Sequence, residues 1–422
     1  MKWNNRSHSA HLTKNFLFSQ LIPYIGNKRK LLDLIQTAIN KTETQPSKSI
    51  FIDCFAGTGV VSRLAKLLGY QVICNDWEHY SYMLNLAAIK IQKPPLFFNQ
   101  KSYQEIIEQL NVLPDKEDWI SKHLCPDDDE NFDLSRDRMF YMRKNGLRLD
   151  AIREQIAQWE KNNILDSEQK ACLIAPLLYS ACYHANTSGV FKGFHKGWGG
   201  QTATALYRIA ANLKIHPLQF YDNKQANEVF CMDAQKFTAL LCKRTMNQPS
   251  VAYLDPPYNQ HPYASNYHVL NSISLWDKPV LSPKITKQEK AAIRSDWREN
   301  RRSAYNSRKQ AIHAYAQLIN TLPTDWIATS YSTDGFITLE DMIHCNCNRG
   351  KVYVFARAYK RYRVSSQRYS HKPRNIEFVI LTQTRQSASQ SARNIAQAIL
   401  DCEAYSLSSS YKNEDTIVEI NL

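Results

Sequence analysis

The feature that most constrains the fold is a short apolar run that ends in a glycine-rich turn and continues with helical spacing. Residues 49–55 predict a buried strand, residues 56–59 form the turn, and apolar residues recur with the helical period over residues 60–68. A strand, a glycine turn and a helix in this order are typical of the first unit of a doubly wound α/β sheet. The sequence therefore predicts an α/β fold with a ligand site at this turn.

The turn and the next strand indicate the kind of ligand. Gly57 and Gly59 let a ligand approach the backbone closely, but the third glycine of the dinucleotide fingerprint is absent, which favours a ligand without a pyrophosphate. The second strand, residues 71–74, is followed by Asp76, which is placed to accept hydrogen bonds from ribose hydroxyls. The alternative is that Asp76 caps the following helix.

A second motif follows the apolar run at residues 251–254. Its members are Asp255, Pro256, Pro257 and Tyr258. The two prolines end the strand and leave rigid carbonyl acceptors without N–H groups. A carboxylate, carbonyl acceptors and an aromatic face together suit a planar group that carries an NH2, such as an adenine turned out of a duplex. The alternative is a Pro-Pro turn whose aspartate caps the next helix.

Composition favours an intracellular protein with a polyanionic partner. The 422 residues include 53 Lys and Arg against 39 Asp and Glu, a net charge of +14, and 23 tyrosines that could stack on bases. A merely basic enzyme is the alternative. The ten cysteines are scattered, many of them in apolar runs, which indicates a reducing compartment. No secretory segment or membrane span is expected, so the predicted location is cytoplasmic.

The α/β rhythm is interrupted once along the chain. It stops near residue 94, gives way to mostly helical patterns, and resumes with the strand at residues 228–233. Strands are also expected at 326–331, 351–356 and 376–382, the last two as a hairpin. The predicted domains are a flexible N-terminus (1–20), a core domain (21–95 and 226–384), a helical insertion (96–225), and a C-terminal linker and helix (385–422).

Three basic segments are candidates for contact with nucleic acid. They are the loop 189–200, which is rich in glycine and aromatic residues, a basic stretch at 280–310 that is expected to be helical, and the tip of the predicted hairpin. A covering surface loop and a solvated helix face are the alternatives for the first two. The candidate DNA-binding residues are Lys192, Lys196, Arg298, Arg301, Arg302, Lys360, Arg361 and Arg363.

Three motifs carry a resemblance over residues 21–383. In chain order they are Tyr24-Ile25-Gly26-Asn27-Lys28, Asp53-Cys54-Phe55-Ala56-Gly57-Thr58-Gly59 and Asp255-Pro256-Pro257-Tyr258. Their order and spacing resemble the D12-class N6-adenine-specific DNA methyltransferases, as do the segments at 186–190 and 266–271. The resemblance implies a Rossmann-like methyltransferase sheet that binds S-adenosylmethionine, with the helical insertion serving DNA recognition.

The resemblance also implies roles for single residues. Asp255, Pro256, Pro257 and Tyr258 would be catalytic, and the carboxylate would accept a hydrogen bond from adenine N6 while the tyrosine ring stacks on the flipped base. The residues expected to bind the cofactor are Tyr24, Lys28, Asp53, Phe55, Gly57, Gly59, Asp76 and Asp233. For Asp233, a cap at the end of its strand is the alternative.

The predicted activity is site-specific methylation of adenine in double-stranded DNA, within a restriction–modification system whose endonuclease acts separately. No metal is expected, because the sulfonium of the cofactor already activates the methyl group. The alternatives are an RNA or protein-amide methyltransferase of the same fold and a non-catalytic DNA-binding protein. The glycine turn together with Asp76 and Asp255 speaks against a mere binder, which needs neither carboxylate.

Overall fold

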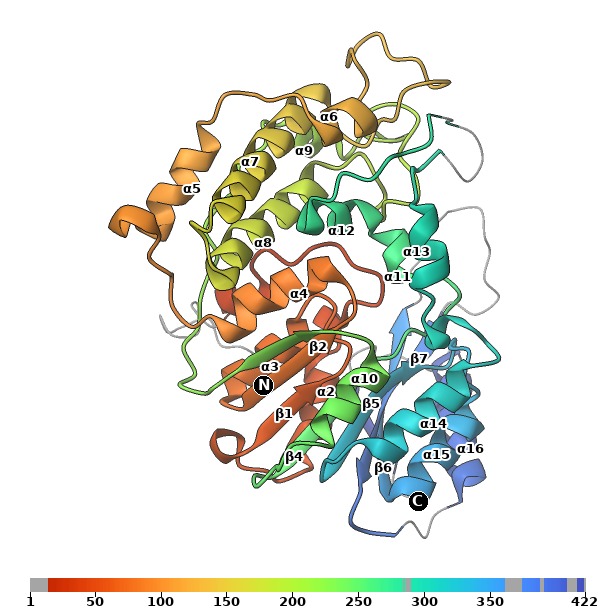
Figure 1. Cartoon of the computed structure of the whole chain (residues 1–422). Helices are drawn as coiled ribbons and strands as arrows, with labels where there is room; N and C mark the ends of the chain where they lie inside the picture. Colours follow the sequence, from red (N-terminus) through yellow and green to blue (C-terminus); the bar gives the residue numbers. More distant parts are fainter. Residues whose placement is uncertain are drawn as a thin grey trace.

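The computed structural model describes residues 14–283, 285, 290–360, 374–387, 391–407 and 416–420. A single sheet forms the lower part of the molecule, and a body of helices lies across the end of the sheet where the parallel strands finish (Figure 1). Both parts contribute to the pocket described below.

The sheet has eight strands in the order β3-β2-β1-β4-β5-β7-β6-β8. The strands β1 to β5 pair in parallel, and β7, β6 and β8 pair antiparallel at one end. The bounds are β1 Ile50–Asp53, β2 Gln71–Asp76, β3 Glu228–Cys231, β4 Ser250–Leu254, β5 Trp326–Ser332, β6 Lys351–Lys360, β7 Arg374–Gln383 and β8 Val418–Ile420. The predicted α/β fold and the predicted terminal hairpin are confirmed.

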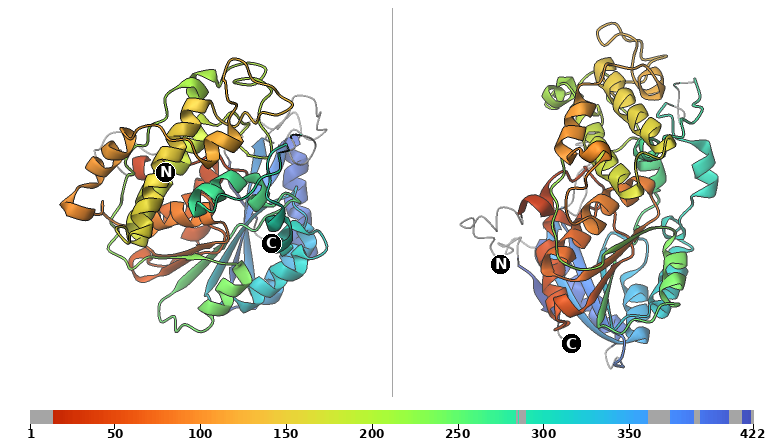
Figure 2. Two further views of the ribbon diagram at one scale, coloured as in Figure 1. Left: turned by 45° about the horizontal axis from the view of Figure 1, so that its top comes forward. Right: turned by 60° about the vertical axis from the view of Figure 1, so that its left-hand side comes forward.

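Alternating side chains fix which helices cover each face of the sheet (Figure 2). Phe51 and Val251 point to one face and pack with α2 and α3, whereas Ile52 and Ala252 point to the other face and pack with α10, α14, α15 and α16. The bounds of these helices are α2 Leu32–Asn40, α3 Val60–Leu68, α10 Ala234–Leu241, α14 Ala311–Thr321, α15 Leu339–Arg349 and α16 Ala392–Leu407. Apolar side chains on both faces suit strands that are buried on two sides.

The helical body is built from two separate passages of the chain. Its helices are α4 His79–Asn85, α5 Tyr103–Asn111, α6 Trp119–Leu124, α7 Arg143–Lys161, α8 Ser167–His184, α9 Leu206–Ala210, α11 Tyr263–Asn266, α12 His268–Leu275 and α13 Ser295–Asn300. The helix α12, which follows β4, packs against α4 and α8. Buried Arg153 of α7 donates to the carbonyls of Ile273 and Ser274 at the end of α12 and so ties the two passages together.

The domain boundaries remain a prediction, and two segments are placed differently from what was expected. Phe16 and Leu17 lie in the segment expected to be flexible, yet both are buried. The C-terminal helix α16 buries Ile395 and Ile399 against the sheet instead of standing apart from it. Short apolar runs at chain ends are poor sequence signals, because only tertiary packing gives them a partner.

The prediction of a helix through the basic stretch 280–310 is wrong for its described residues. Only α13 and a 3-10 turn at Ala304–Asn306 are helical within it, and the next helix, α14, begins at Ala311. Pro279 and Pro283 interrupt the start of the stretch. Arg294 then pairs with Asp277 and Asp296, which stabilises a bend. The many basic residues of this stretch therefore did not indicate a helix.

Candidate active site

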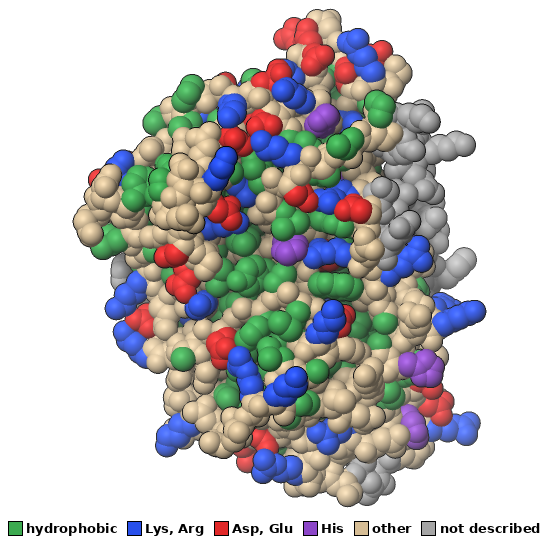
Figure 3. Space-filling view, in the orientation of Figure 1, with side chains coloured by type: hydrophobic (Ala, Val, Ile, Leu, Met, Phe, Trp, Pro, Cys, Tyr) green, Lys and Arg blue, Asp and Glu red, His purple; other side chains and the backbone are tan. Residues whose placement is uncertain are grey.

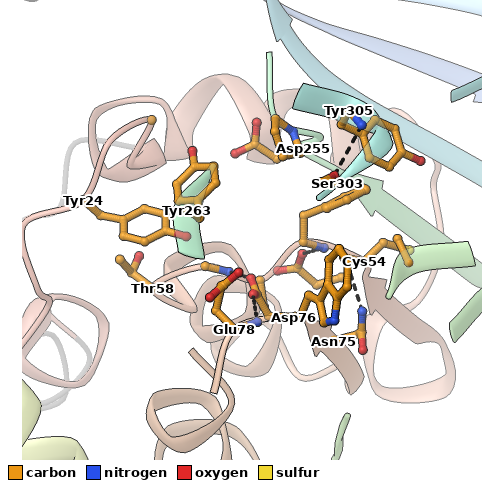
Figure 4. A pocket seen from close by; sticks show the side chains of 18 of the residues that line it. Tyr24, Cys54, Thr58, Asn75, Asp76, Glu78, Asp255, Tyr263, Ser303 and Tyr305 are labelled. Carbon is orange, nitrogen blue, oxygen red and sulfur yellow. Dashed lines mark hydrogen bonds between the residues drawn. The ribbon is translucent and has the colours of Figure 1, made fainter. Parts of the chain in front are cut away.

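A pocket opens where the parallel strands β1, β2 and β4 end, with about 910 Å³ of empty space that includes its opening to solvent (Figure 4). In doubly wound sheets ligands bind outside the carboxyl ends of the strands, where the strand order reverses, and β1 has β2 on one side and β4 on the other. The predicted site residues that line the pocket are Tyr24, Lys28, Asp53, Phe55, Gly57, Asp76, Asp233, Asp255 and Pro257. Three separate sequence motifs are thus brought into one place.

The two glycines of the turn serve different purposes. Gly57 lines the pocket with φ of +51°, and a Cβ there would lie 3.0 Å from Cε1 of Tyr24. Gly59 is not among the pocket-lining residues, and a Cβ at that position would lie 2.3 Å from Oδ1 of Asn85. The amide of Asn85 in turn donates to the carbonyl of Gly57 at 3.2 Å. Gly59 therefore supports the turn through packing, whereas Gly57 faces the ligand space.

Asp76 ends β2 and holds the turn from the other side. Its Oδ2 accepts from Gly57 N at 2.8 Å, and its Oδ1 accepts from Glu78 N at 2.8 Å. The N-cap position of α4 belongs to Glu78, so Asp76 is not the cap of that helix. Burial raises the pKa of Asp76, and these backbone hydrogen bonds oppose the rise. Its carboxylate faces the pocket with acceptor capacity to spare.

Two further acids line the pocket, and each accepts hydrogen bonds from a different partner. Asp53 is buried, accepts from Ser62 Oγ at 2.7 Å, and has its pKa raised to about 7 by burial. Asp233 lines the pocket and is also the N-cap of α10, because Oδ1 accepts from Gln235 N at 2.9 Å. The structure thus shows Asp233 both capping its helix and facing the pocket.

The Asp255 carboxylate forms an ion pair directly after β4. Its Oδ1 lies 3.0 Å from Nζ of Lys28, whose residue is 4% exposed. The same ammonium lies 5.6 Å from the centroid of the Tyr258 ring, which packs edge-on against Tyr331 at 5.9 Å. The tetrapeptide is thus held against the segment that carries Lys28, and Pro256 and Tyr258 are not among the residues that line the pocket.

The ion pair determines the charge of Asp255. Burial raises the pKa of Asp255, and the Lys28 ammonium opposes that rise. Burial alone would lower the pKa of Lys28, but the carboxylates of Asp255 and Glu377 and two tyrosines raise it well above its ordinary value. The pair therefore presents a charged carboxylate, which only accepts hydrogen bonds, in a largely dry place.

Residues 24–291 match the family described as D12 class N6 adenine-specific DNA methyltransferase. The chain belongs to this family. It is 31% identical over 352 residues to the type II methyltransferase M.NlaIII of Neisseria lactamica, covering 83% of this chain and 95% of that protein. It is 28% identical to M.CviAII of Paramecium bursaria Chlorella virus 1, covering 81% of this chain and 93% of the relative. M.FokI of Planomicrobium okeanokoites is 28% identical, and the match covers 83% of this chain but half of M.FokI.

The family membership confirms the prediction of an enzyme, an adenine-specific DNA methyltransferase, over an RNA or protein-amide methyltransferase and over a non-catalytic binder. It also confirms the Rossmann-like fold expected from the motifs. Within the described ranges, no group of three or more His, Cys, Asp or Glu side chains could hold a metal ion. Over the same ranges, no helix has the length and apolar character needed to cross a membrane.

Several pocket residues of the methyltransferase were not predicted from the sequence. Arg301, expected to contact DNA, lines the pocket and lies 3.5 Å from Glu78 Oε2, while its other nitrogen donates to Trp77 O at 3.3 Å. Burial raises the pKa of Glu78 to about 7, and Arg301 opposes the rise. Asn271 of α12 also donates to Glu78. The sequence contained one indication that Glu78 lines the pocket, namely its position two residues after Asp76 at the end of β2.

Stacked tyrosines form another unpredicted part of the wall. Tyr24 stacks on Tyr263 with ring centroids 5.0 Å apart and on Tyr267 at 4.9 Å. The hydroxyl of Tyr80 donates to that of Tyr24 at 3.2 Å. This cluster joins the N-terminal motif, the β2–α4 region and the helices after β4, and Figure 4 shows Tyr24 and Tyr263 side by side. No residue spacing along the chain indicated that these rings lie together.

The loop 189–200 is more ordered than its glycines suggest. Asn186 accepts from Gly199 N and donates to Met139 O, and Phe191 is buried with its N–H donating to Asn266 O at 2.7 Å. These hydrogen bonds and the buried ring attach the loop to the segments around it. The ammonium of Lys192 lies 3.3 Å from His261 Nδ1.

The other predicted DNA contacts are spread along the chain. Lys196 and Arg302 are exposed. The side chains of Arg298 and Lys360 lie outside the described part of the structure, as do Arg361 and Arg363 entirely. On the face drawn in Figure 3, Lys and Arg side chains lie among acidic ones and do not gather in one patch. These DNA contacts stay predictions.

Proposed function

We propose that this enzyme transfers the methyl group of S-adenosylmethionine to N6 of an adenine that is turned out of duplex DNA at a specific site. The observation that carries the proposal is the position of Asp255. Its carboxylate, charged through Lys28, lines the same pocket as the glycine turn and Asp76. A methyl donor and an amino group could therefore meet at one carboxylate.

The pocket suits a ligand with positive charge and a ribose. Five of its lining residues are acids and two are cations, although the whole chain carries a charge of +14. The acids favour a cationic ligand, and Asp76 is placed for ribose hydroxyls. Bound S-adenosylmethionine supplies an activated methyl group on a sulfonium. Its binding residues would be Tyr24, Asp53, Phe55, Gly57, Asp76 and Asp233, with Gly59 supporting the turn.

The chemistry assigned to the tetrapeptide concerns the nitrogen lone pair. The N6 lone pair of adenine is delocalised into the ring, which makes the nitrogen a weak nucleophile. Hydrogen bonds from N6 to the Asp255 carboxylate and the Pro256 carbonyl favour a pyramidal nitrogen whose lone pair is free to attack. These bonds strengthen as N6 becomes positive, so they stabilise the transition state more than the ground state. Once the methyl group is attached, the cationic N6 gives up one proton through the Asp255 carboxylate to solvent water.

The central test is Asp255→Asn, with Asp325→Asn as the matched control. Asp325 accepts from Ser250 N at the opposite end of β4, so its loss perturbs the same strand away from the pocket. In this variant the side-chain amide of residue 255 can still accept a hydrogen bond from Lys28. It can also turn its NH2 group toward N6, where the reaction needs an acceptor. We expect methyl transfer to unmethylated plasmid DNA to fall roughly 100- to 1000-fold for Asp255→Asn only, with cofactor affinity kept. A fully active Asp255→Asn, or a modified base other than N6-methyladenine by mass spectrometry, contradicts the proposal.

We further propose that the modification belongs to a restriction–modification system. M.NlaIII and M.FokI are named type II methyltransferases, and the present chain covers almost the whole of the first. The recognised site can be found by sequencing the modified adenines in the DNA of cells that express the protein. DNA so modified should resist one sequence-specific endonuclease. Modification scattered over unrelated sequences would contradict a role in restriction–modification.

A further inference from the structure

A second buried acid lies on the same side of the sheet as Asp255. Tyr253 in β4 and Val379 in β7 both face the core under α2 and α3, so Asp255 and Glu377, two positions away from them, emerge on that face too. Glu377 pairs in register with Ser332 at the end of β5, next to β4. Lys28 acts electrostatically on both carboxylates.

Glu377 is poorly satisfied for a buried acid. It is 9% exposed, and the hydrogen bond that it receives among the described residues is a long one of 3.4 Å from Asn375 Nδ2. Arg357 lies opposite Glu377 on the neighbouring strand but does not pair with it. The Arg357 guanidinium donates instead to Asp33 and to Lys30 O. A buried carboxylate with so little support is costly unless a cation can reach it.

Lys28 lies beside both groups that the proposed function assigns to adenine. Its ammonium is 3.0 Å from Asp255 Oδ1, where the N6 amino group would donate, and it lies over the ring of Tyr258, where the base would stack. A flipped adenine therefore meets Lys28 before it can make full contact with Asp255 and Tyr258. The displaced ammonium must not be left buried without a counter-charge, because an unpaired buried charge is strongly unfavourable.

We propose that Glu377 is a positioning residue for methyl transfer, whose carboxylate takes over the Lys28 ammonium when adenine takes up Asp255 and Tyr258. This inference rests on the proposed function. No covalent bond changes in the step: Lys28 exchanges one carboxylate for another, and Asp255 exchanges an ammonium for the N6 amino group. Both acids must be ionised for the exchange to preserve charge.

The exchange makes methyl transfer depend on the ionisation of Glu377. Among the residues that the structure describes, the charged or titratable groups around it are Lys28, Asp255, Tyr258, Asp334 after β5, and Arg357 and Tyr359 of β6. Burial raises the pKa of Glu377 to about 7, Lys28 opposes the rise, and Asp255 and Asp334 add to it. Below this pH the carboxyl is neutral and cannot hold the ammonium, so the rate should fall as the pH falls through about 7.

The experiment compares the wild type with Glu377→Gln, Glu377→Asp and Glu403→Gln. Glu403 is a buried acid on α16 that accepts from Thr333 Oγ1 at 2.8 Å, and it serves as the matched control. Single-turnover transfer of labelled methyl groups from saturating S-adenosylmethionine to unmethylated plasmid DNA is followed from roughly pH 6 to pH 8. Cofactor affinity by calorimetry reports whether each variant is folded.

We expect the wild type and Glu403→Gln to gain rate with rising pH, and Glu377→Gln to gain less rate over the same range and to be about ten-fold or more slower at the alkaline end. Glu377→Asp should regain part of the pH dependence with unchanged cofactor affinity. An active wild type whose pH profile is shared by Glu377→Gln overturns this inference alone. If the wild type does not methylate adenine in DNA, the proposed function fails and this inference fails with it.

Discussion

At the scale of residues, the Lys28–Asp255 ion pair favours the charged form of the proposed catalytic carboxylate before adenine binds. Removing the ammonium in Lys28→Met leaves burial unopposed, so the pKa of Asp255 should rise further. A protonated carboxyl cannot accept from N6 in the same way. We therefore expect the variant to be inactive near neutral pH and to recover activity as the pH rises. A full pH–rate profile of methyl transfer checks this.

The matched control is Lys30→Met, in the same 3-10 turn at Lys28–Lys30. Lys30 is exposed, and its contact with Arg357 is made by the backbone carbonyl. Its pH–rate profile should match that of the wild type. A Lys28→Met variant whose profile does not move would mean that Lys28 does not govern the ionisation of Asp255.

Asp76 should act on affinity more than on turnover. Asp76→Ala removes acceptors for a ribose and frees Gly57 N, so cofactor binding should weaken by about 1–3 kcal/mol. Calorimetry with S-adenosylmethionine measures the loss, and Asp222→Ala, which breaks an ion pair with Lys224 outside the pocket, is the control. Equal affinities of the two variants would leave Asp76 with a purely structural role.

At the scale of elements, the junction of β1 and α3 depends on one glycine and one amide. Gly59→Ala places a Cβ 2.3 Å from Asn85 Oδ1 at φ of +77°. The free energy of unfolding should fall by about 1–3 kcal/mol through strain alone. Asn85→Ala removes the atom with which the new Cβ clashes. Gly59→Ala should therefore lower the free energy of unfolding less in the Asn85→Ala background than in the wild type. Denaturant melts of the four proteins measure this coupling, and strict additivity would contradict the packing role.

Much of the sheet was predictable from the sequence, because its strands are short apolar runs bounded by Gly, Pro and Asp. The glycine turn and the aspartate-proline motif also located most of the pocket. Side-chain partners were not predictable. Lys28, in a 3-10 turn near the start of the chain, meets Asp255 after β4, and Arg301 reaches Glu78, because the fold brings distant segments together. The helix expected at 280–310 failed because local ion pairs and prolines, and not helical periodicity, determine that segment.

At the scale of the whole molecule, the basic charge should appear in the salt dependence of DNA binding. Replacing Arg361 and Arg363 together, which the sequence predicts at a hairpin tip, should lower affinity at all sequences and reduce the salt slope by about one to two units if both touch phosphates. If either reads a guanine, the loss should fall on the recognised site, at roughly 1–3 kcal/mol. Binding titrations at several salt concentrations distinguish phosphate contact from base readout. Unchanged affinity and an unchanged salt slope would exclude Arg361 and Arg363 as DNA contacts.

The pairing of β1 with β4 also has a consequence for how the protein is made. Ile50 lies opposite Ser250, so β1 leaves the ribosome 200 residues before the strand that completes its other edge. At roughly 5–20 residues per second, that edge stays open for about 10–40 s during translation. The helical insertion is synthesised in this interval, and the last residue that lines the pocket is Asn306. A nascent chain therefore exposes an unpaired strand edge well before it can bind any ligand, which makes β1 a point of aggregation risk during synthesis.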